Sequence, residues 1–465
     1  MRASDWLAIL TELVGDRTLR LAVTGLSRSG KTAFIASLVH NLLSAAGRPG
    51  RLPFPRAAAE RRILCARLLA PHSDNVPAFP IEETVAALAA DPPHWPASTT
   101  DLRRVRMSLR FSSSGFLRGS GLFGGGSQVT LEILDYPGEW LLDLPLLQQN
   151  YGDWSRTTLA LARRGVRASR ARDWLDFLAR YPVDRGGDPE TALRAHRLYR
   201  DYLAACRDRE QLSLLQPGRF LNPGQIADMS ILQFCPVPLA IGAQAASGSL
   251  AALMEARFER YKRVIVQPFF ALLARNVDRQ IVLVDVLPAL NAGEEAFADQ
   301  RRALDTILSV FRFGRRSLLR RLFGARIDRV LFAATKADHV PAVQRDHLEA
   351  LMANLVETPT LRAKAAHARA AATALASIRC TEDGTDAIDG RKVDVVVGLP
   401  EGGERRIRFF PGIVPVTPPP AGFWGERFTE FPIFQPPRII AAARDGIPHI
   451  NLDKALDFLL EDILA

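Results

Sequence analysis

The chain has 465 residues, of which 48% are hydrophobic and 24% charged, and its 60 Lys and Arg residues outnumber 50 Asp and Glu residues. This balance is typical of a folded protein and excludes an intrinsically disordered chain. No run of about 18 apolar residues occurs, which excludes a membrane-spanning helix. We expect no secretory signal, because Asp5 and Glu12 interrupt the apolar N-terminus. The four cysteines form no C-x-x-C pair, so a reducing cytoplasmic compartment is favoured over a disulfide framework.

The first 149 residues are expected to contain the first half of a sheet with its helices. In chain order we predict a helix over 4–14, a strand over 19–24, a helix over 31–43, a helix over 58–69 and strands over 106–111 and 129–134. A Gly- and Ser-rich loop over 112–127 would connect the last two strands as a hairpin.

The periodicity changes at residue 150. From 150 to 276 it is helical, with breaks near 185–189 and 216–224, and it predicts an inserted helical subdomain. Beyond the insertion we predict buried strands over 281–286, 330–334 and 373–378, a hairpin over 393–397 and 405–410, a Pro-rich stretch over 415–437 and a helix over 453–464. Strands that alternate with helices predict an α/β fold with a mostly parallel sheet. The expected division is 1–149 and 278–390 for the two parts of the core, 150–277 for the insertion and 391–465 for the C-terminal part.

The run Gly25-Leu26-Ser27-Arg28-Ser29-Gly30-Lys31-Thr32 fits the phosphate-loop pattern G-x-x-x-x-G-K-[ST], and it lies between a predicted strand and a predicted helix. Glycines allow the backbone N–H groups to wrap around phosphates at a helix N-terminus. Lys31 would reach the β- and γ-phosphates, and the Thr32 hydroxyl would bind Mg²⁺. The residues expected to bind the phosphates are Gly25, Ser27, Arg28, Ser29, Gly30, Lys31, Thr32 and Ala33.

A second motif, Asp135-Tyr136-Pro137-Gly138, ends the predicted strand over 129–134. An acidic residue at this point can hold Mg²⁺, and the Gly138 amide can sense the γ-phosphate. A threonine before the strand over 106–111 is expected to contact the same metal; Thr99 is the first candidate and Thr100 the second. The simpler interpretation is an ordinary strand–turn junction, which also favours Asp and Gly.

A third motif, Thr335-Lys336-Ala337-Asp338, follows the strand over 330–334. One carboxylate can accept hydrogen bonds from both N1–H and N2–H of guanine, whereas adenine offers an acceptor there. Asp338 would therefore select guanine, and the Lys336 stem would lie along the purine face. Ser377 and Ile378, at the end of the next strand, are candidates for a main-chain contact with guanine O6.

These segments together resemble the YcjX-type stress proteins, which are Ras-like GTP-binding proteins of bacteria. The runs LAVTGLSRSGKTAFIASLV, WPASTTDLRR, LDYPGEW and TKAD carry the resemblance, with DVLPALNAG and FFPGIVP further along. It implies a Ras-like P-loop NTPase core, GTP or GDP with Mg²⁺ as ligands, and a cytoplasmic protein of the stress response. The resemblance also implies a membrane-protein partner.

Two positions depart from the Ras-like pattern. Glu139 stands where Ras-type enzymes have the Gln that orients the attacking water, and Ala97 stands where some G proteins have a built-in arginine before the switch threonine. Because an arginine finger is worth about 10³–10⁵ in rate, we expect slow GTP hydrolysis. Lys31, Thr99, Gly138 and Glu139 are the candidate catalytic residues.

The segment over 315–323 is basic and amphipathic. Its pattern favours a solvated helix face whose Leu residues pack inward over the alternative, in which it docks on anionic lipid at the inner membrane or on an acidic partner. No DNA- or RNA-binding motif accompanies the excess of positive charge, so we expect no specific nucleic-acid partner.

Two rival functions remain open at this point. The chain could be an ATPase in which the Thr-Lys-Ala-Asp sequence is coincidental. It could also be a scaffold in which nucleotide only braces the fold and the helical insertion binds a partner.

Overall fold

The computed structural model describes residues 17–26, 28–46, 63–70, 76–111, 127–184, 186–227, 229–239, 245–275, 277–310, 327–425, 430–439 and 446–464. The predictions for residues 4–14, for the loop over 112–126, for Ser27 and for the basic segment 315–323 lie outside these residues.

The core is a seven-stranded sheet with the strand order β2-β3-β4-β1-β5-β6-β7. Its strands are β1 (Arg17–Gly25), β2 (Ile63–Leu68), β3 (Arg103–Phe111), β4 (Ser127–Asp135), β5 (Arg279–Val284), β6 (Arg329–Ala334) and β7 (Arg369–Ala374). The five strands from β4 to β7 run parallel, whereas β2 and β3 are antiparallel additions at one edge. The predicted α/β fold with a mostly parallel sheet, as in P-loop NTPases, is confirmed.

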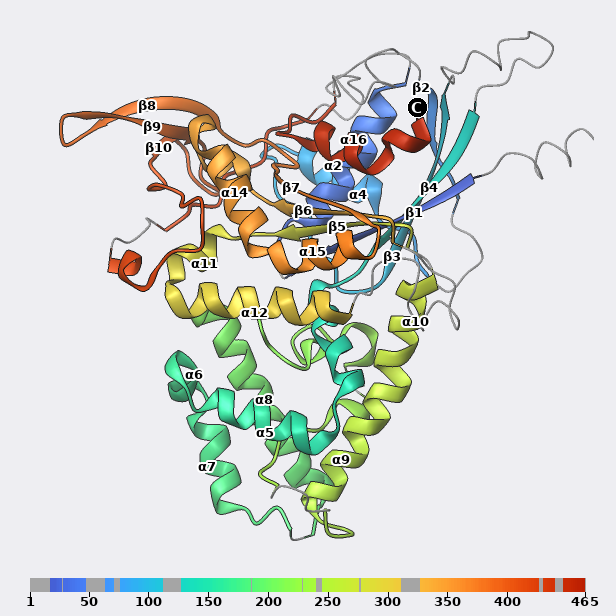
Figure 1. The fold of residues 1–465 in the computed structure, drawn as a ribbon, viewed down its shortest axis with the longest axis vertical. Coiled ribbons are helices and arrows are strands. Elements are labelled where there is room, and N and C mark those ends of the chain that lie inside the picture. Colours follow the sequence, from blue (N-terminus) through green and yellow to red (C-terminus); the bar gives the residue numbers. More distant parts are fainter. Residues whose placement is uncertain are drawn as a thin grey trace, which may run out of the picture.

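Successive side chains along each strand point to opposite faces of the sheet, and each face packs against a separate hydrophobic core. Ile281 and Leu283 join a core with α2 (Lys31–Ser44) and α16 (Leu452–Leu464), whereas Val282 and Val284 point to the opposite core. That opposite core is covered by α12 (Glu294–Val310) and α14 (Arg345–Leu355) and continues into the helices of residues 151–275. Figure 1 shows α2 and α16 on one side of the sheet and α12 on the other. Both faces are therefore buried, as the near-continuous apolar strands require.

The helices predicted for residues 150–276 are present; in Figure 1 most of them gather beneath α12, and the last of them, α10, rises beside it. They are α5 (Tyr151–Ala162), α6 (Gly165–Arg170), α7 (Arg172–Arg180), α8 (Pro189–Glu210), α9 (Leu250–Tyr261) and α10 (Gln267–Arg275). Large aromatic residues fill the space between them; the Trp154 and Phe258 rings stack with centroids 4.9 Å apart. Buried aromatic side chains contribute the most area per residue to such a core. The insertion is therefore a packed body continuous with the core of the sheet.

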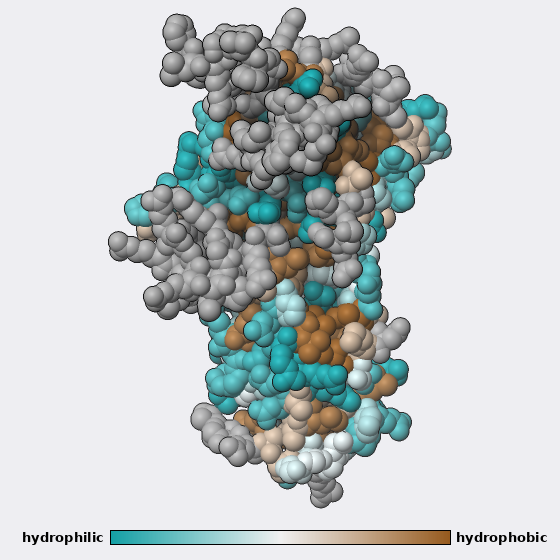
Figure 2. Space-filling view, turned by 90° about the vertical axis from the view of Figure 1, so that its right-hand side faces the viewer, coloured by the Kyte–Doolittle hydropathy of each residue, from teal (hydrophilic) through white to brown (hydrophobic). Residues whose placement is uncertain are grey.

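A second, three-stranded antiparallel sheet consists of β8 (Glu382–Ile388), β9 (Arg391–Gly398) and β10 (Ile407–Phe409), so it begins before residue 391, and it projects to one side in Figure 1. The predicted pairing of residues 393–397 with 405–410 is confirmed by β9 and β10, and the predicted final helix by α16. Within the described residues, the core also contains the helices α4 (Ile81–Ala89), α11 (Leu287–Ala292) and α15 (Glu357–Ala365). Within the described residues, no helix has both the length and the apolar character needed to cross a bilayer. Figure 2 shows one face of the molecule, where hydrophilic residues alternate with separate hydrophobic patches.

Two predicted elements were wrong, and helix α4 and strand β8 were not predicted. The predicted helix over 58–69 contains the strand β2, which pairs with the free edge of β3, because an apolar run of this length fits either element. The strand predicted over 373–378 is β7 over 369–374, where alanines obscure the strand signal and pairing with β6 decides the register. Strand β8 was missed because its sequence, EDGTDAI, is polar and its side chains are largely exposed.

Candidate nucleotide-binding site

The carboxyl ends of the five parallel strands meet at one edge of the sheet, and predicted site segments lie at the ends of four of them, β1, β4, β6 and β7. Gly25 ends β1 and Asp135 ends β4, while Thr335 follows β6 and Ala376–Ile378 follow β7. A pocket of about 400 Å³ lies there, within the size range of small-molecule and cofactor sites. Its lining includes Arg28, Ser29, Gly30, Lys31, Thr32, Ala33, Thr99, Glu139, Thr335, Lys336, Asp338, Ser377 and Ile378. Among the predicted site residues, Gly25, Asp135 and Gly138 do not line the pocket but contact residues that do.

The phosphate-loop segment forms a turn between β1 and α2, as the motif requires. Gly30 precedes the helix with a left-handed φ of 80°, which favours glycine. The Lys31 ammonium is buried in the turn and donates hydrogen bonds to the carbonyl oxygens of Gly25, at 2.9 Å, and Leu26, at 3.1 Å. Burial lowers the pKa of Lys31, and the charges of Glu139 and Asp135 partly oppose this shift. A nearby anion would therefore stabilise the charged ammonium in this turn.

Three oxygen-bearing side chains converge beside the turn. The Thr99 hydroxyl donates a hydrogen bond of 2.6 Å to Asp135 Oδ2 and lies 3.2 Å from the Thr32 hydroxyl. Thr100 instead bonds the neighbouring Asp101 at the surface. The other carboxylate oxygen of Asp135, Oδ1, is buried with no hydrogen-bond partner among the described residues, and burial raises the pKa of this carboxyl although Thr99 and Lys31 counteract it. A carboxylate and two hydroxyls are hard oxygen donors that suit Mg²⁺, and a cation here would satisfy Oδ1.

Gly138 lies directly against the phosphate loop. A Cβ at this position would be 1.5 Å from the Gly25 carbonyl oxygen and 3.0 Å from Lys31 Nζ. Only a residue without a side chain permits this approach. The segment after β4 therefore contacts the same turn as the lysine, and Glu139, next along the chain, faces the pocket.

At the other end of the pocket, Asp338 is buried and held by the loop that follows β7. Its Oδ2 accepts a 2.9 Å hydrogen bond from the Cys380 N–H, and its Oδ1 is 3.3 Å from His339 Nδ1. Burial acts to raise the pKa of Asp338, but the His339 ring and the Cys380 N–H outweigh it, so the pKa lies below its usual value. The carboxylate is therefore ionised at neutral pH and keeps lone pairs for further donors.

Lys336 has a partner that the motifs did not reveal. Its ammonium lies 2.6 Å from Asp285 Oδ2, at the end of β5, and the charge of Asp285 raises the pKa of Lys336. The Thr335 hydroxyl is buried, lines the same pocket and has no hydrogen-bond partner in the part of the chain described here. Asp285 falls within the DVLPALNAG run, but no established spacing connects it with Lys336.

Several other lining residues come from segments without a motif. Trp95 donates from Nε1 to the Phe434 carbonyl oxygen at 2.9 Å, which ties the segment before Thr99 to the C-terminal part of the chain. Ile433 and Phe434 line the pocket from that part, and Asn222 lines it from the helical insertion. Asn222, Ile433 and Phe434 lie far from the motifs in the sequence, which explains why sequence reasoning missed them.

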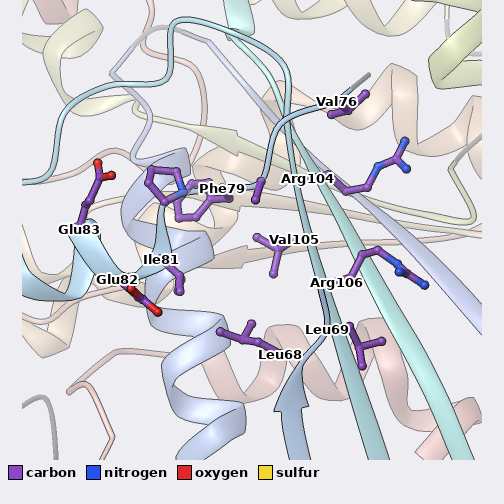
Figure 3. Close-up of a pocket in the computed structure, with 12 residues that line it drawn as sticks. Leu68, Leu69, Val76, Phe79, Ile81, Glu82, Glu83, Arg104, Val105 and Arg106 are labelled. Atoms are coloured by element: carbon purple, nitrogen blue, oxygen red, sulfur yellow. The ribbon is translucent and has the colours of Figure 1, made fainter. Parts of the chain in front are cut away.

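A second pocket, of about 280 Å³, lies beside β2 and β3, at one edge of the sheet (Figure 3). It is lined by residues of β2 and β3, by the start of α4 and by the segment before α4, and these include Phe79, Arg104 and Arg106. None of the predicted site residues borders it, so the pocket at the strand ends is the candidate functional site.

The geometry agrees with what comparison with known proteins finds. The model of the YcjX-like family, DUF463, matches residues 19–464. The chain belongs to this family. The YcjX-like relative named "Ras-like GTPase YcjX" from Escherichia coli K12 is 39% identical over 461 residues, which cover 97% of this chain and 96% of the relative. The protein of the same name from Shewanella oneidensis is 33% identical over 490 residues, with 98% and 96% covered. The predicted resemblance to YcjX-type proteins is therefore confirmed over nearly the whole chain.

Proposed function

We propose that the chain binds GTP and GDP with Mg²⁺ and acts as a nucleotide switch with slow GTP hydrolysis. The observation that carries the proposal is the pocket itself, which gathers the phosphate loop, Thr99, Glu139 and the Thr335–Asp338 motif at one edge of the sheet. The names of the two relatives, both Ras-like GTPases, favour the same function.

At the phosphate end, Lys31 and the N–H groups of the turn would hold the β- and γ-phosphates. Thr32, Thr99 and Asp135 would hold Mg²⁺, which neutralises charge on the phosphates. In this arrangement Thr99 and Gly138 each contact groups near the γ-phosphate, so its loss would release both segments. We define residues 95–101 as the first switch segment and 137–143 as the second.

At the base end, Asp338 would accept the N1–H and N2–H of guanine, and Lys336 would extend along the purine face. The contacts of Asp338 with Cys380 and His339 would fix its orientation before nucleotide arrives. Ser377 and Ile378 would place main-chain N–H groups beside guanine O6. Thr335, with its unpartnered hydroxyl, borders the same region.

Slow turnover follows from Glu139. Its carboxylate can accept a hydrogen bond from the attacking water but cannot donate one to a phosphoryl oxygen. Arg28 lines the pocket, but its guanidinium lies 3.4 Å from Asp208 of α8, an ion pair between exposed side chains. We therefore expect GTP hydrolysis to be much slower than in enzymes that have an arginine finger.

Single-turnover release of phosphate from GTP with Mg²⁺ tests the proposal, with Lys31→Ala as the blank. We expect slow release by the unaltered protein, dependent on Mg²⁺ and absent in the variant. Release from ATP alone would favour the rival ATPase. Nucleotide binding with no release above the Lys31→Ala blank would favour the rival scaffold.

A role in the bacterial stress response and a peripheral contact with the inner membrane are separate parts of the proposal. They rest on the resemblance and on the composition of Arg315–Phe323. Cosedimentation with vesicles that contain anionic lipid, compared with neutral vesicles, tests the membrane contact. Equal binding to both, or to neither, would contradict it.

A further inference from the structure

A loop of the helical insertion touches both switch segments. The loop comprises residues 216–225, between α8 and α9, and we call it the bridging loop. Its Gly218 packs against the main chain of Glu139, because a Cβ there would lie 1.8 Å from the Glu139 carbonyl oxygen. At its other end, the Gln225 N–H donates to Asp101 Oδ1 at 3.3 Å. One short loop therefore spans the two segments that the γ-phosphate is proposed to control.

A buried carboxylate fixes the bridging loop to the second switch segment. Asp143 accepts hydrogen bonds from the Gly218 N–H at 2.7 Å, from the Arg219 N–H at 3.3 Å and from the Tyr261 hydroxyl, at the end of α9, at 2.6 Å. The Arg219 guanidinium lies 3.5 Å from the centre of the Trp140 ring, a close cation–π contact. Satisfied buried polar networks of this kind define one geometry.

Asn222 occupies the centre of this arrangement and also lines the nucleotide pocket. Its carbonyl oxygen accepts a 2.9 Å hydrogen bond from Trp140 Nε1, in the second switch segment. Its side-chain amide donates to the Thr99 carbonyl oxygen at 3.4 Å, in the first switch segment. The same residue thus contacts both segments and stands beside the threonine whose hydroxyl reaches Asp135.

We infer that the helical insertion supplies a positioning residue, Asn222, which holds the first switch segment in the conformation that places Thr99 beside the metal and the γ-phosphate. This inference rests on the proposed function. It identifies the contact through which the insertion would respond to whether GTP or GDP is bound. Release of Thr99 on loss of the γ-phosphate would loosen Asn222 and, through Trp140 and Gly218, the bridging loop.

The test compares the affinities of the full-length chain for a non-hydrolysable GTP analogue and for GDP, both measured with Mg²⁺. Asn222→Ala removes the amide that holds Thr99, so we expect the affinity for the analogue to fall about threefold to tenfold, the range for one neutral hydrogen bond. The affinity for GDP should change by less than twofold, because Thr99 would contact only the triphosphate state. Trp140→Phe, which keeps a ring for Arg219 but removes the donor to Asn222, should act in the same direction.

Asn354→Ala is the matched control, because the side-chain amide of Asn354 also bonds main-chain carbonyls, those of Ala350 and Val416, but lies on α14 outside the pocket. It should leave both affinities unchanged. Equal losses for the analogue and GDP in Asn222→Ala would show a merely structural role and overturn the inference, as would no loss for either. Failure of the unaltered chain to bind guanine nucleotide would instead overturn the proposed function.

Discussion

At the scale of single residues, base selectivity depends on Asp338. Its carboxylate is buried, ionised and oriented by the Cys380 N–H before any base arrives. A carboxylate matched to two donors of guanine discriminates strongly, since adenine would leave it facing an acceptor.

We therefore predict that Asp338→Asn weakens GTP binding by about 10- to 150-fold, which corresponds to about 1.5–3 kcal/mol for a hydrogen bond to a charged group. Binding of xanthosine triphosphate should improve, because the amide can donate to the 2-oxo group of xanthine. Displacement of a fluorescent nucleotide by each triphosphate measures both effects. Unchanged GTP affinity would mean that Asp338 does not read the base.

Motif residues could be found from the sequence because each motif has a fixed spacing between chemically required groups. The phosphate loop, Asp135 and Asp338 all carry such a spacing, and the structure places them at one edge of the sheet. Asp285 and Asn222 have no such signal. Asp285 meets Lys336 because the sheet order brings β5 next to β6, and Asn222 reaches the pocket because a loop of the insertion returns to the switch segments.

At the scale of elements, the contact between the phosphate loop and the second switch segment is tight. Gly138→Ala would place a methyl group 1.5 Å from the Gly25 carbonyl oxygen, so one segment must move. We predict a loss of about 1–3 kcal/mol of stability, the usual cost of overpacking, and a loss of preference for GTP over GDP. Chemical denaturation and nucleotide affinities measure these effects, and Gly422→Ala, where the added Cβ meets nothing within 4 Å, is the control. Full retention of stability and preference would contradict the proposed contact.

The Asp143 network predicts a pH dependence of stability. Burial raises the pKa of Asp143 to about 6 in the folded chain, although the Tyr261 hydroxyl and Arg219 oppose this shift; an unfolded Asp titrates near 3.9. A folded state with the higher pKa binds the proton more tightly. Protonation of Asp143 therefore contributes its full stabilisation of the folded chain below about pH 4, and this stabilisation is lost as the pH rises through 6.

Asp143→Asn abolishes this titration. The stability of the unaltered chain relative to the variant should fall between pH 4 and pH 7, by about 1.4 kcal/mol for each pH unit between the two pKa values. Urea denaturation across this range checks the prediction, with the exposed Asp394→Asn as control. Parallel pH profiles for the unaltered chain and Asp143→Asn would show that Asp143 does not titrate in this way.

Helices and strands were predicted best where the hydrophobic pattern of a segment agreed with the motifs next to it in the sequence. The strands β1 and β6 are each followed directly by a motif, and β5 is a near-continuous apolar run, so the positions of all three were predicted to within about two residues. Strand β2 was predicted as a helix and β7 was displaced, because pairing with a neighbouring strand, which is a tertiary effect, decides both. The local sequence of a segment does not show which strand of the sheet has an unpaired edge available to it.

At the scale of the whole molecule, three parts of the chain meet at the pocket. The sheet supplies the motifs, the insertion supplies Asn222, and the C-terminal part supplies Ile433 and Phe434. We propose that the division into 1–149 with 278–390, 150–277 and 391–465 describes working parts of one switch. In this scheme the state of the γ-phosphate would be transmitted to the insertion through the bridging loop.

Selective binding of guanine nucleotide tests the central claim most directly. A fluorescent GDP bound to the purified full-length chain with Mg²⁺ is titrated with unlabelled GTP and, separately, with ATP. The proposed site predicts that GTP displaces the probe at a concentration at least about 100-fold lower than ATP. Displacement by ATP at the same concentration as GTP, or no binding of the probe at all, would contradict the proposed function.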